Sequence, residues 1–219
     1  MTRKKLLVTG CGRSGTLYAT EVWRKIGLDI RHERPVPPNG VMGEDGIASW
    51  YMAVDDPYPP YGPGGYQYSF DYIIHQVRHP LKVIASVAQF ILRVDANSRQ
   101  YIERNCAETR LTDKQMQLGD GERLVLQSAL YWYYWNQLAE SKADITLQVE
   151  KLTSNLPRLC QEIGVEYRSD DLDKIPNTVN ERQNYIRETP WVLSWEDIKQ
   201  LDEKLYVNIF EQAKRYGYL

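Results

Sequence analysis

The stretch that decides the fold is residues 5–20, which read Lys-Leu-Leu-Val-Thr-Gly-Cys-Gly-Arg-Ser-Gly-Thr-Leu-Tyr-Ala-Thr. An apolar run ends at Gly10, a loop of small residues follows, and a helical pattern begins at Thr16. Strand, glycine-rich turn and helix form the layout of a phosphate-binding loop. Glycines let the backbone approach an anion, and a helix N-terminus directs N–H groups at it. The sequence therefore predicts an anion site at residues 10–16.

The loop lacks the Gly-Lys-Ser/Thr ending of nucleotide triphosphatases. Its cation is Arg13, and Ser14 and Thr16 supply hydroxyl groups. Together with Gly12 and Gly15, these residues are expected to wrap a phosphate, with the guanidinium adding charge-assisted hydrogen bonds. An ordinary tight turn is the alternative interpretation. We favour the phosphate loop because Arg-Ser-Gly-Thr stands directly at the start of a helix.

Composition limits the classes of function. The 219 residues are most simply one domain, 1–219, and 27 basic against 29 acidic residues do not indicate a nucleic-acid surface. No run of about 18 apolar residues could span a membrane, and no signal peptide is recognisable. Three widely spaced cysteines favour a reducing compartment over disulfides or zinc, so we expect a cytoplasmic protein without a metal.

Hydrophobic patterning predicts an α/β fold, a three-layer α/β/α arrangement with a mainly parallel central sheet like that of P-loop nucleotide triphosphatases. Residues 34–69, rich in proline, glycine and aromatics, are expected to hold a short helix near 46–54 and to cover a substrate site. Residues 95–120 have no clear pattern. Strands are predicted over 5–9, 28–32, 70–77 and 145–149, and helices over 16–26, 80–93, 122–139, 156–163 and 194–216.

A second candidate pair is Arg78 and Ser86. Arg78 ends a predicted strand, and Ser86 lies just over two helical turns later, so both can face one groove. A fixed guanidinium and a hydroxyl there would suit a second phosphate. If only this pair is considered, the simpler interpretation is a surface arginine and an ordinary helix serine without a binding role. With the loop, both features fall where an open α/β sheet binds ligands.

Residues 10–16, Gly-Cys-Gly-Arg-Ser-Gly-Thr, and residues 77–86, Val-Arg-His-Pro-Leu-Lys-Val-Ile-Ala-Ser, together resemble the sulfotransferase family. The nearest variants are bacterial members that act on carbohydrates or small molecules. The resemblance implies 3′-phosphoadenosine 5′-phosphosulfate (PAPS) as co-substrate. It assigns Arg13, Ser14, Gly15 and Thr16 to the 5′-phosphosulfate, and Arg78 and Ser86 to the 3′-phosphate.

The chain departs from the family in two places. Many cytosolic members carry lysine where Arg13 stands; an arginine donates a proton less readily but still stabilises charge on the bridging oxygen. The Arg-Lys-Gly segment that completes the 3′-phosphate site in those members has no clear counterpart. Residues 180–190, with Asn180, Arg182, Asn184 and Arg187, are a possible substitute.

The catalytic base is predicted at the exit of the second strand. Sulfuryl transfer needs a group that takes a proton from the acceptor, and Glu33 stands where related enzymes place a catalytic glutamate. His32, the neighbouring residue, is the alternative base. If neither residue is catalytic, the expected role is a structural one, such as a salt bridge to Arg31 or Arg34. We expect His79 to cap the helix that begins at Pro80.

The sequence therefore predicts a PAPS-dependent sulfotransferase that modifies a hydroxyl or amine of a carbohydrate or small molecule, with no nucleic-acid or membrane partner. The aromatic run 130–135 is expected to be mostly core, although one tyrosine there could line the acceptor pocket. Two alternatives stay open. One is a P-loop kinase of a small metabolite, and the other is a non-catalytic nucleotide-binding protein that kept the loop and lost the base.

Overall fold

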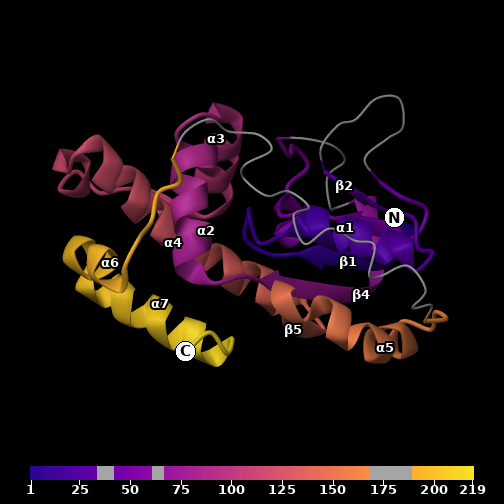
Figure 1. Cartoon of the computed structure of the whole chain (residues 1–219). Helices are drawn as coiled ribbons and strands as arrows, with labels where there is room; N and C mark the ends of the chain where they lie inside the picture. Colours follow the sequence, from indigo (N-terminus) through magenta and orange to yellow (C-terminus); the bar gives the residue numbers. More distant parts are fainter. Residues whose placement is uncertain (34–41, 61–66, 168–188) are drawn as a thin grey trace.

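The protein folds around one five-stranded sheet (Figure 1). The computed structural model describes residues 1–33, 42–60, 67–167 and 189–219. The strands pair in the order β2-β3-β1-β4-β5 and every pairing is parallel, which confirms the predicted parallel α/β sheet. The strands are β1 (Thr2–Thr9), β2 (Ile30–His32), β3 (Gly46–Ala48), β4 (Tyr68–Val77) and β5 (Ile145–Gln148).

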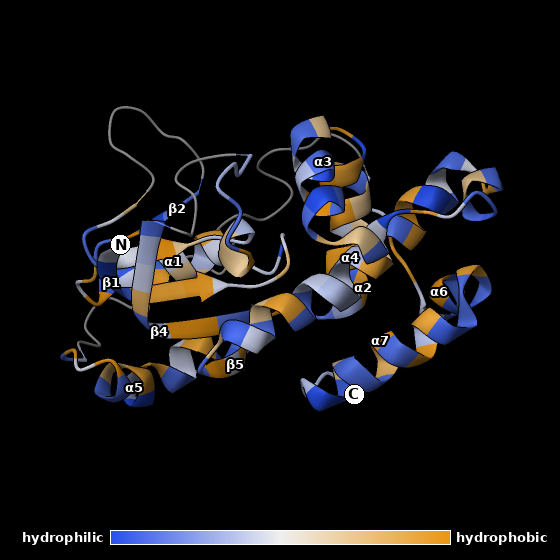
Figure 2. Ribbon diagram, turned by 180° about the vertical axis from the view of Figure 1, so that it is seen from behind, coloured by the Kyte–Doolittle hydropathy of each residue, from blue (hydrophilic) through white to orange (hydrophobic). Residues whose placement is uncertain are grey.

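Helices flank this sheet and extend beyond its carboxyl edge, where α2 leaves β4 (Figure 1). In both overall views, α3 and α6 lie at the end of the molecule away from the sheet (Figures 1 and 2). The helices are α1 (Thr16–Lys25), α2 (Pro80–Val87), α3 (Ala96–Asn105), α4 (Asp120–Lys142), α5 (Leu152–Glu162), α6 (Trp195–Leu201) and α7 (Glu203–Arg215). A π-helical turn, Ala88–Leu92, continues α2.

Alternate strand residues face two separate cores. Leu6 and Val8 pack with α1 and α5, whereas Leu7 packs with α2, α4 and α7. Because side chains alternate along a strand, this division places apolar layers on both faces of the sheet. Strands β1 and β4 are correspondingly hydrophobic in Figure 2, whereas the helices carry both kinds of residue. None of the helices within the described ranges has the length and apolar composition needed to cross a bilayer.

Three predicted elements need correction. The predicted helix at 46–54 is instead strand β3 followed by a 3₁₀ turn, Tyr51–Ala53, because residues 46–48 pair with β1 and β2 inside the sheet. Residues 95–120 include helix α3, which is polar and packs through Tyr101 and Ile102. The predicted helix at 194–216 is two helices, because Asp202 leaves the helical conformation and its side chain caps α7.

The central strands set the position of the site. Strand β1 lies between β3 and β4, and Val8 is in register with both Ala48 and Ile74. The segments that follow β1, β2 and β4 therefore begin along one edge of the sheet, where parallel α/β sheets bind ligands. Residues 34–41 and 61–66 of the predicted cover lie outside the described residues.

Candidate anion-binding site

The chain turns sharply where β1 ends. A Cβ atom at Gly10 would lie 2.2 Å from the carbonyl oxygen of Gln76 on β4, so only glycine fits this close approach. Gly15 stands at the N-cap of α1 with φ of 92°, in the left-handed region that favours glycine. No side chain of the described residues caps α1. Its first N–H groups, which have no acceptor inside the helix, are thus directed at the loop.

Arg13 also adopts a left-handed conformation, with φ of 72°. This geometry costs a residue other than glycine about 1–2 kcal/mol. The side chain then reaches α2, where its Nε donates to the Oγ of Ser86 at 2.9 Å. Arg13 and Ser86 were predicted to bind different phosphates, and the structure places them in direct contact. The two predicted phosphate sites are therefore adjacent.

The rear of the loop is held by helix α4. The backbone N–H of Cys11 donates to the side-chain oxygen of Asn136 at 3.2 Å, and that of Gly12 donates to the hydroxyl of Tyr131 at 2.9 Å. On the β4 side, Gln76 Nε2 donates to the carbonyl oxygen of Ser14 at 2.9 Å. Fully buried side chains thus fix both ends of the loop.

The Asn136 contact continues into the sheet. Its Oδ1 also accepts from His75 Nε2 at 3.0 Å, and His75 Nδ1 lies 3.1 Å from the hydroxyl of Thr146 on β5. Since Oδ1 can only accept, the proton is assigned to Nε2 and the Thr146 hydroxyl donates to Nδ1. Burial lowers the pKa of His75 to about 4, so the ring is neutral at pH 7.

One buried side-chain oxygen of the loop has no hydrogen-bond partner within the described residues. The Oγ of Ser14 is completely buried and bonds to none of them. A buried hydroxyl without a partner costs free energy and calls for an explanation. A bound anion in the loop would supply an acceptor for it.

The two candidate bases contact each other, and His32 also contacts the first residue of α1. The Nε2 of His32 is 3.0 Å from the Thr16 hydroxyl and 3.3 Å from Glu33 Oε1. Glu33 is only 6% exposed. Burial raises the pKa of Tyr51, and the charge of the Glu33 carboxylate raises it further. The buried Glu33 carboxylate is thus close enough to Tyr51 for its charge to affect that hydroxyl.

Arg78 lies at the end of β4, next to the end of β1 in the sheet. It is half-buried, and its guanidinium makes no hydrogen bond or ion pair with the described residues. Burial and then Glu150 raise the pKa of Tyr218, and the charge of Arg78 offsets part of this rise. The Tyr218 hydroxyl lies 2.8 Å from Glu150 Oε2 and 3.0 Å from the carbonyl oxygen of Val77. A cation left in this setting is suited to an anionic ligand.

The prediction that His79 caps α2 is wrong. His79 stands at the N-cap position, but its side chain makes no capping hydrogen bond. The ring instead packs against Trp195 and Tyr218, with centroid separations of 6.1 and 5.6 Å. Burial lowers its pKa, and the nearby charge of Lys82 lowers it further.

Sequence reasoning missed the residues that hold the loop from behind. Tyr131 and Asn136 were grouped into an aromatic core helix, and Gln76 into an apolar strand. The available signal was chemical: an amide within a buried apolar segment must find a hydrogen-bond partner. Of the predicted residues, the structure joins Arg13 to Ser86, and His32 to both Thr16 and Glu33. Residues 180–187, proposed to complete the site, lie outside the described residues.

No protein-family model matches this chain, and a comparison with curated proteins also finds no match. The resemblance to sulfotransferases thus depends on the two motifs. Among the described residues, no group of three side chains is arranged to hold a metal ion.

Proposed function

We propose that the protein is a PAPS-dependent sulfotransferase. The observation that carries this proposal is the pairing of two anion-seeking features at the ends of neighbouring strands. The uncapped N-terminus of α1, with the buried Ser14 hydroxyl, follows β1. The half-buried Arg78, without a partner among the described residues, ends β4. Two adjacent anion sites suit a nucleotide with phosphate groups on both the 5′ and 3′ positions.

The proposed reaction is an in-line transfer. The acceptor oxygen or nitrogen forms a bond to sulfur while the bond from sulfur to the bridging oxygen breaks, and adenosine 3′,5′-bisphosphate leaves. Arg13 and the N–H groups of α1 would stabilise the negative charge on the leaving phosphate. Glu33 would accept the acceptor's proton, with His32 Nε2 lying 3.3 Å from its carboxylate. Arg78 and Ser86 would hold the 3′-phosphate.

A nucleotide titration distinguishes this proposal from its alternatives. By calorimetry, adenosine 3′,5′-bisphosphate should bind more tightly than ATP, with or without Mg²⁺. A preference for MgATP would favour a small-metabolite kinase and contradict our proposal. Tight binding of the bisphosphate with no transfer from PAPS to any phenol, sugar or amine tested would favour the non-catalytic alternative.

The choice of base is tested by two variants. Glu33→Gln keeps the shape and one hydrogen-bonding oxygen but cannot take the proton. We expect transfer of labelled sulfate to fall by about 10²–10⁴-fold, while nucleotide affinity stays within about twofold. His32→Ala should have a smaller effect on transfer. If Glu33→Gln stays active and His32→Ala is inactive, His32 is the base.

The proposal also includes the acceptor class, the finer topology and the cellular location predicted from the sequence. The acceptor would be a carbohydrate or small molecule, with the aromatic segment 34–69 as its lining. The topology would be that of a P-loop, three-layer α/β/α protein. We also propose a cytoplasmic location, supported by the three cysteines, which are buried and not joined in disulfides.

A further inference from the structure

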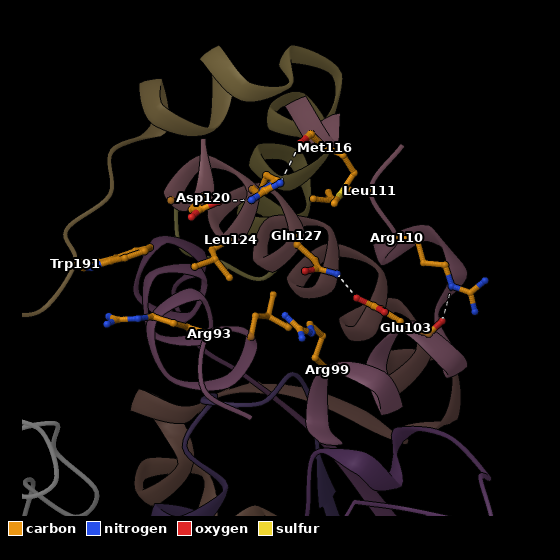
Figure 3. A pocket seen from close by; sticks show the side chains of 13 residues that line it. Arg93, Arg99, Glu103, Arg110, Leu111, Met116, Asp120, Leu124, Gln127 and Trp191 are labelled. Carbon is orange, nitrogen blue, oxygen red and sulfur yellow. Dashed lines mark hydrogen bonds and ion pairs between the residues drawn. The ribbon is translucent and has the colours of Figure 1, made fainter. Parts of the chain in front are cut away.

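A large cavity lies at the end of the molecule away from the sheet, between α3 and the first turns of α4 (Figure 3). Its volume is about 830 Å³, within the range of small-molecule sites. Apolar side chains from four segments line it: Leu92, Leu111, Met116, Leu124 and Trp191. None of the lining residues belongs to the loop at 10–16 or to the Arg78 and Ser86 pair.

Two hydrogen bonds from a buried glutamine hold the backbone at Trp191, whose side chain lines the cavity. Gln89, only 1% exposed, donates from Nε2 to the carbonyl oxygen of Thr189 at 3.1 Å. Its Oε1 accepts from the backbone N–H of Trp191 at 3.2 Å. Gln89 belongs to the π-helical turn after α2, a feature often found at functional sites. A buried amide thus fixes the backbone that leads into the tryptophan.

The cavity is basic although the whole chain is slightly acidic. Four arginines line it against two carboxylates, whereas the formal net charge of the chain is −2. Arg123 is ion-paired with Asp120. The carboxylate of Glu103 is held by Gln127, whose Nε2 lies 2.6 Å from Oε1. The arginines of the lining thus outnumber its carboxylates by two.

Arg99 is the cation best placed to meet a ligand. It is exposed on α3, and within the described residues its guanidinium makes no hydrogen bond or ion pair. In Figure 3 its side chain extends from α3, at the edge of the cavity, in the direction of Leu124 and Gln127. A guanidinium beside an apolar wall suits a molecule that carries an anionic group on a hydrophobic body.

We propose that this cavity binds a small organic anion with an apolar body, such as an aryl sulfate, sulfonate or carboxylate. The anionic group would be bound by Arg99, and the apolar body would lie against Leu92, Leu124 and Trp191. The proposal does not depend on the sulfotransferase reaction, because it concerns residues outside the loop. The cavity would bind the organic anion whichever nucleotide the loop binds.

The test is calorimetric titration with 2-naphthyl sulfate and with neutral 2-naphthol, which has the same ring system. We expect one molecule of the sulfate to bind per chain, at least about tenfold more tightly than the naphthol. Arg99→Gln should weaken the sulfate about five- to tenfold. Glu103→Gln, which removes a negative charge but keeps a side-chain oxygen for Gln127, should strengthen it about two- to threefold. Arg158→Gln, an exposed arginine on α5, is the matched control and should change affinity less than twofold.

Three results would overturn the proposal. The first is equal affinity for the sulfate and the naphthol, and the second is unchanged affinity in Arg99→Gln. The third is displacement of naphthyl sulfate by adenosine 3′,5′-bisphosphate, which would place the anion in the loop. Simultaneous binding of both ligands supports two sites. If the bisphosphate fails to bind while naphthyl sulfate still responds to Arg99→Gln, only the proposed function fails.

Discussion

The loop at 10–16 and the cavity beside α3 are both proposed to bind anions, but they are built in opposite ways. The loop uses backbone N–H groups, and buried side chains such as Tyr131 and Asn136 hold its conformation. The cavity uses side chains, with the exposed Arg99 as its main cation. The loop is held directly by side chains of the core, whereas the main cation of the cavity lies at its solvent-exposed rim.

This difference separates stability from binding. A change behind the loop removes a buried hydrogen bond, so it should lower the free energy of unfolding as well as ligand affinity. A change at the cavity rim should alter binding alone. The free energy of unfolding of variants in the two regions measures this contrast.

The largest effect is expected for the pH dependence due to His75. Its pKa is about 4 in the folded state, mainly because of burial, and about 6.5 when unfolded. The unfolded state therefore binds an extra proton as the pH falls from 6.5 to 4. That proton lowers the free energy of unfolding by up to about 3 kcal/mol. In His75→Gln this contribution should vanish. Urea unfolding of both proteins at pH 7 and 4 measures it, and parallel losses in the two would contradict the neutral, buried histidine.

Tyr131→Phe should lower the free energy of unfolding by less than the protonation linked to His75 does. It leaves the buried N–H of Gly12 without its acceptor, so the free energy of unfolding should fall by about 1–3 kcal/mol. Affinity for adenosine 3′,5′-bisphosphate should fall with it. Tyr133→Phe, a half-exposed neighbour on α4, should change stability by less than about 0.5 kcal/mol. Equal effects of the two substitutions would show that the hydroxyl does not support the loop.

Arg13 allows backbone strain to be separated from charge. Arg13→Gly and Arg13→Ala both remove the guanidinium, so they should weaken nucleotide binding equally. Glycine tolerates the φ of 72° and alanine does not, so the glycine variant should be more stable by about 1 kcal/mol. Denaturant unfolding of the pair measures this difference. Equal stabilities would mean that the position is not strained.

The smallest effect is expected at the cavity. Arg99→Gln should change the free energy of unfolding by less than about 0.5 kcal/mol, because the side chain is exposed and unpaired among the described residues. The same denaturant titration measures it. A loss of more than about 1 kcal/mol would show that the arginine has a structural role, and the contrast between the two regions would fail.

The sequence predicts what neighbouring residues determine together. The strand, loop and helix around 5–20 follow from consecutive residues, and the parallel sheet follows from apolar strands without alternation. The pair His32 and Glu33 was also found, but its geometry was not. The two candidate bases lie next to each other, and His32 Nε2 is within 3.3 Å of both Thr16 and Glu33. Spacing alone could not describe this arrangement.

The rest depends on contacts between distant segments. Tyr131 and Asn136 bond to loop residues more than a hundred positions away, and their helix reads simply as aromatic core. Strand β3 has three residues, too few for any period, and its identity comes from its neighbours in the sheet. The cavity is assembled from five segments, none of which carries a motif. Patterns within a segment cannot reveal such sites.

The most direct test of the central claim concerns Arg78. Calorimetry should compare adenosine 3′,5′-bisphosphate with adenosine 5′-phosphate on the wild type, on Arg78→Ala and on Arg24→Ala, a control at the far end of α1. We predict that the wild type and the control prefer the bisphosphate by at least about tenfold. Arg78→Ala should lose that preference while its affinity for the 5′-phosphate stays within about twofold. A preference that persists in Arg78→Ala, or that the wild type lacks, would contradict the account.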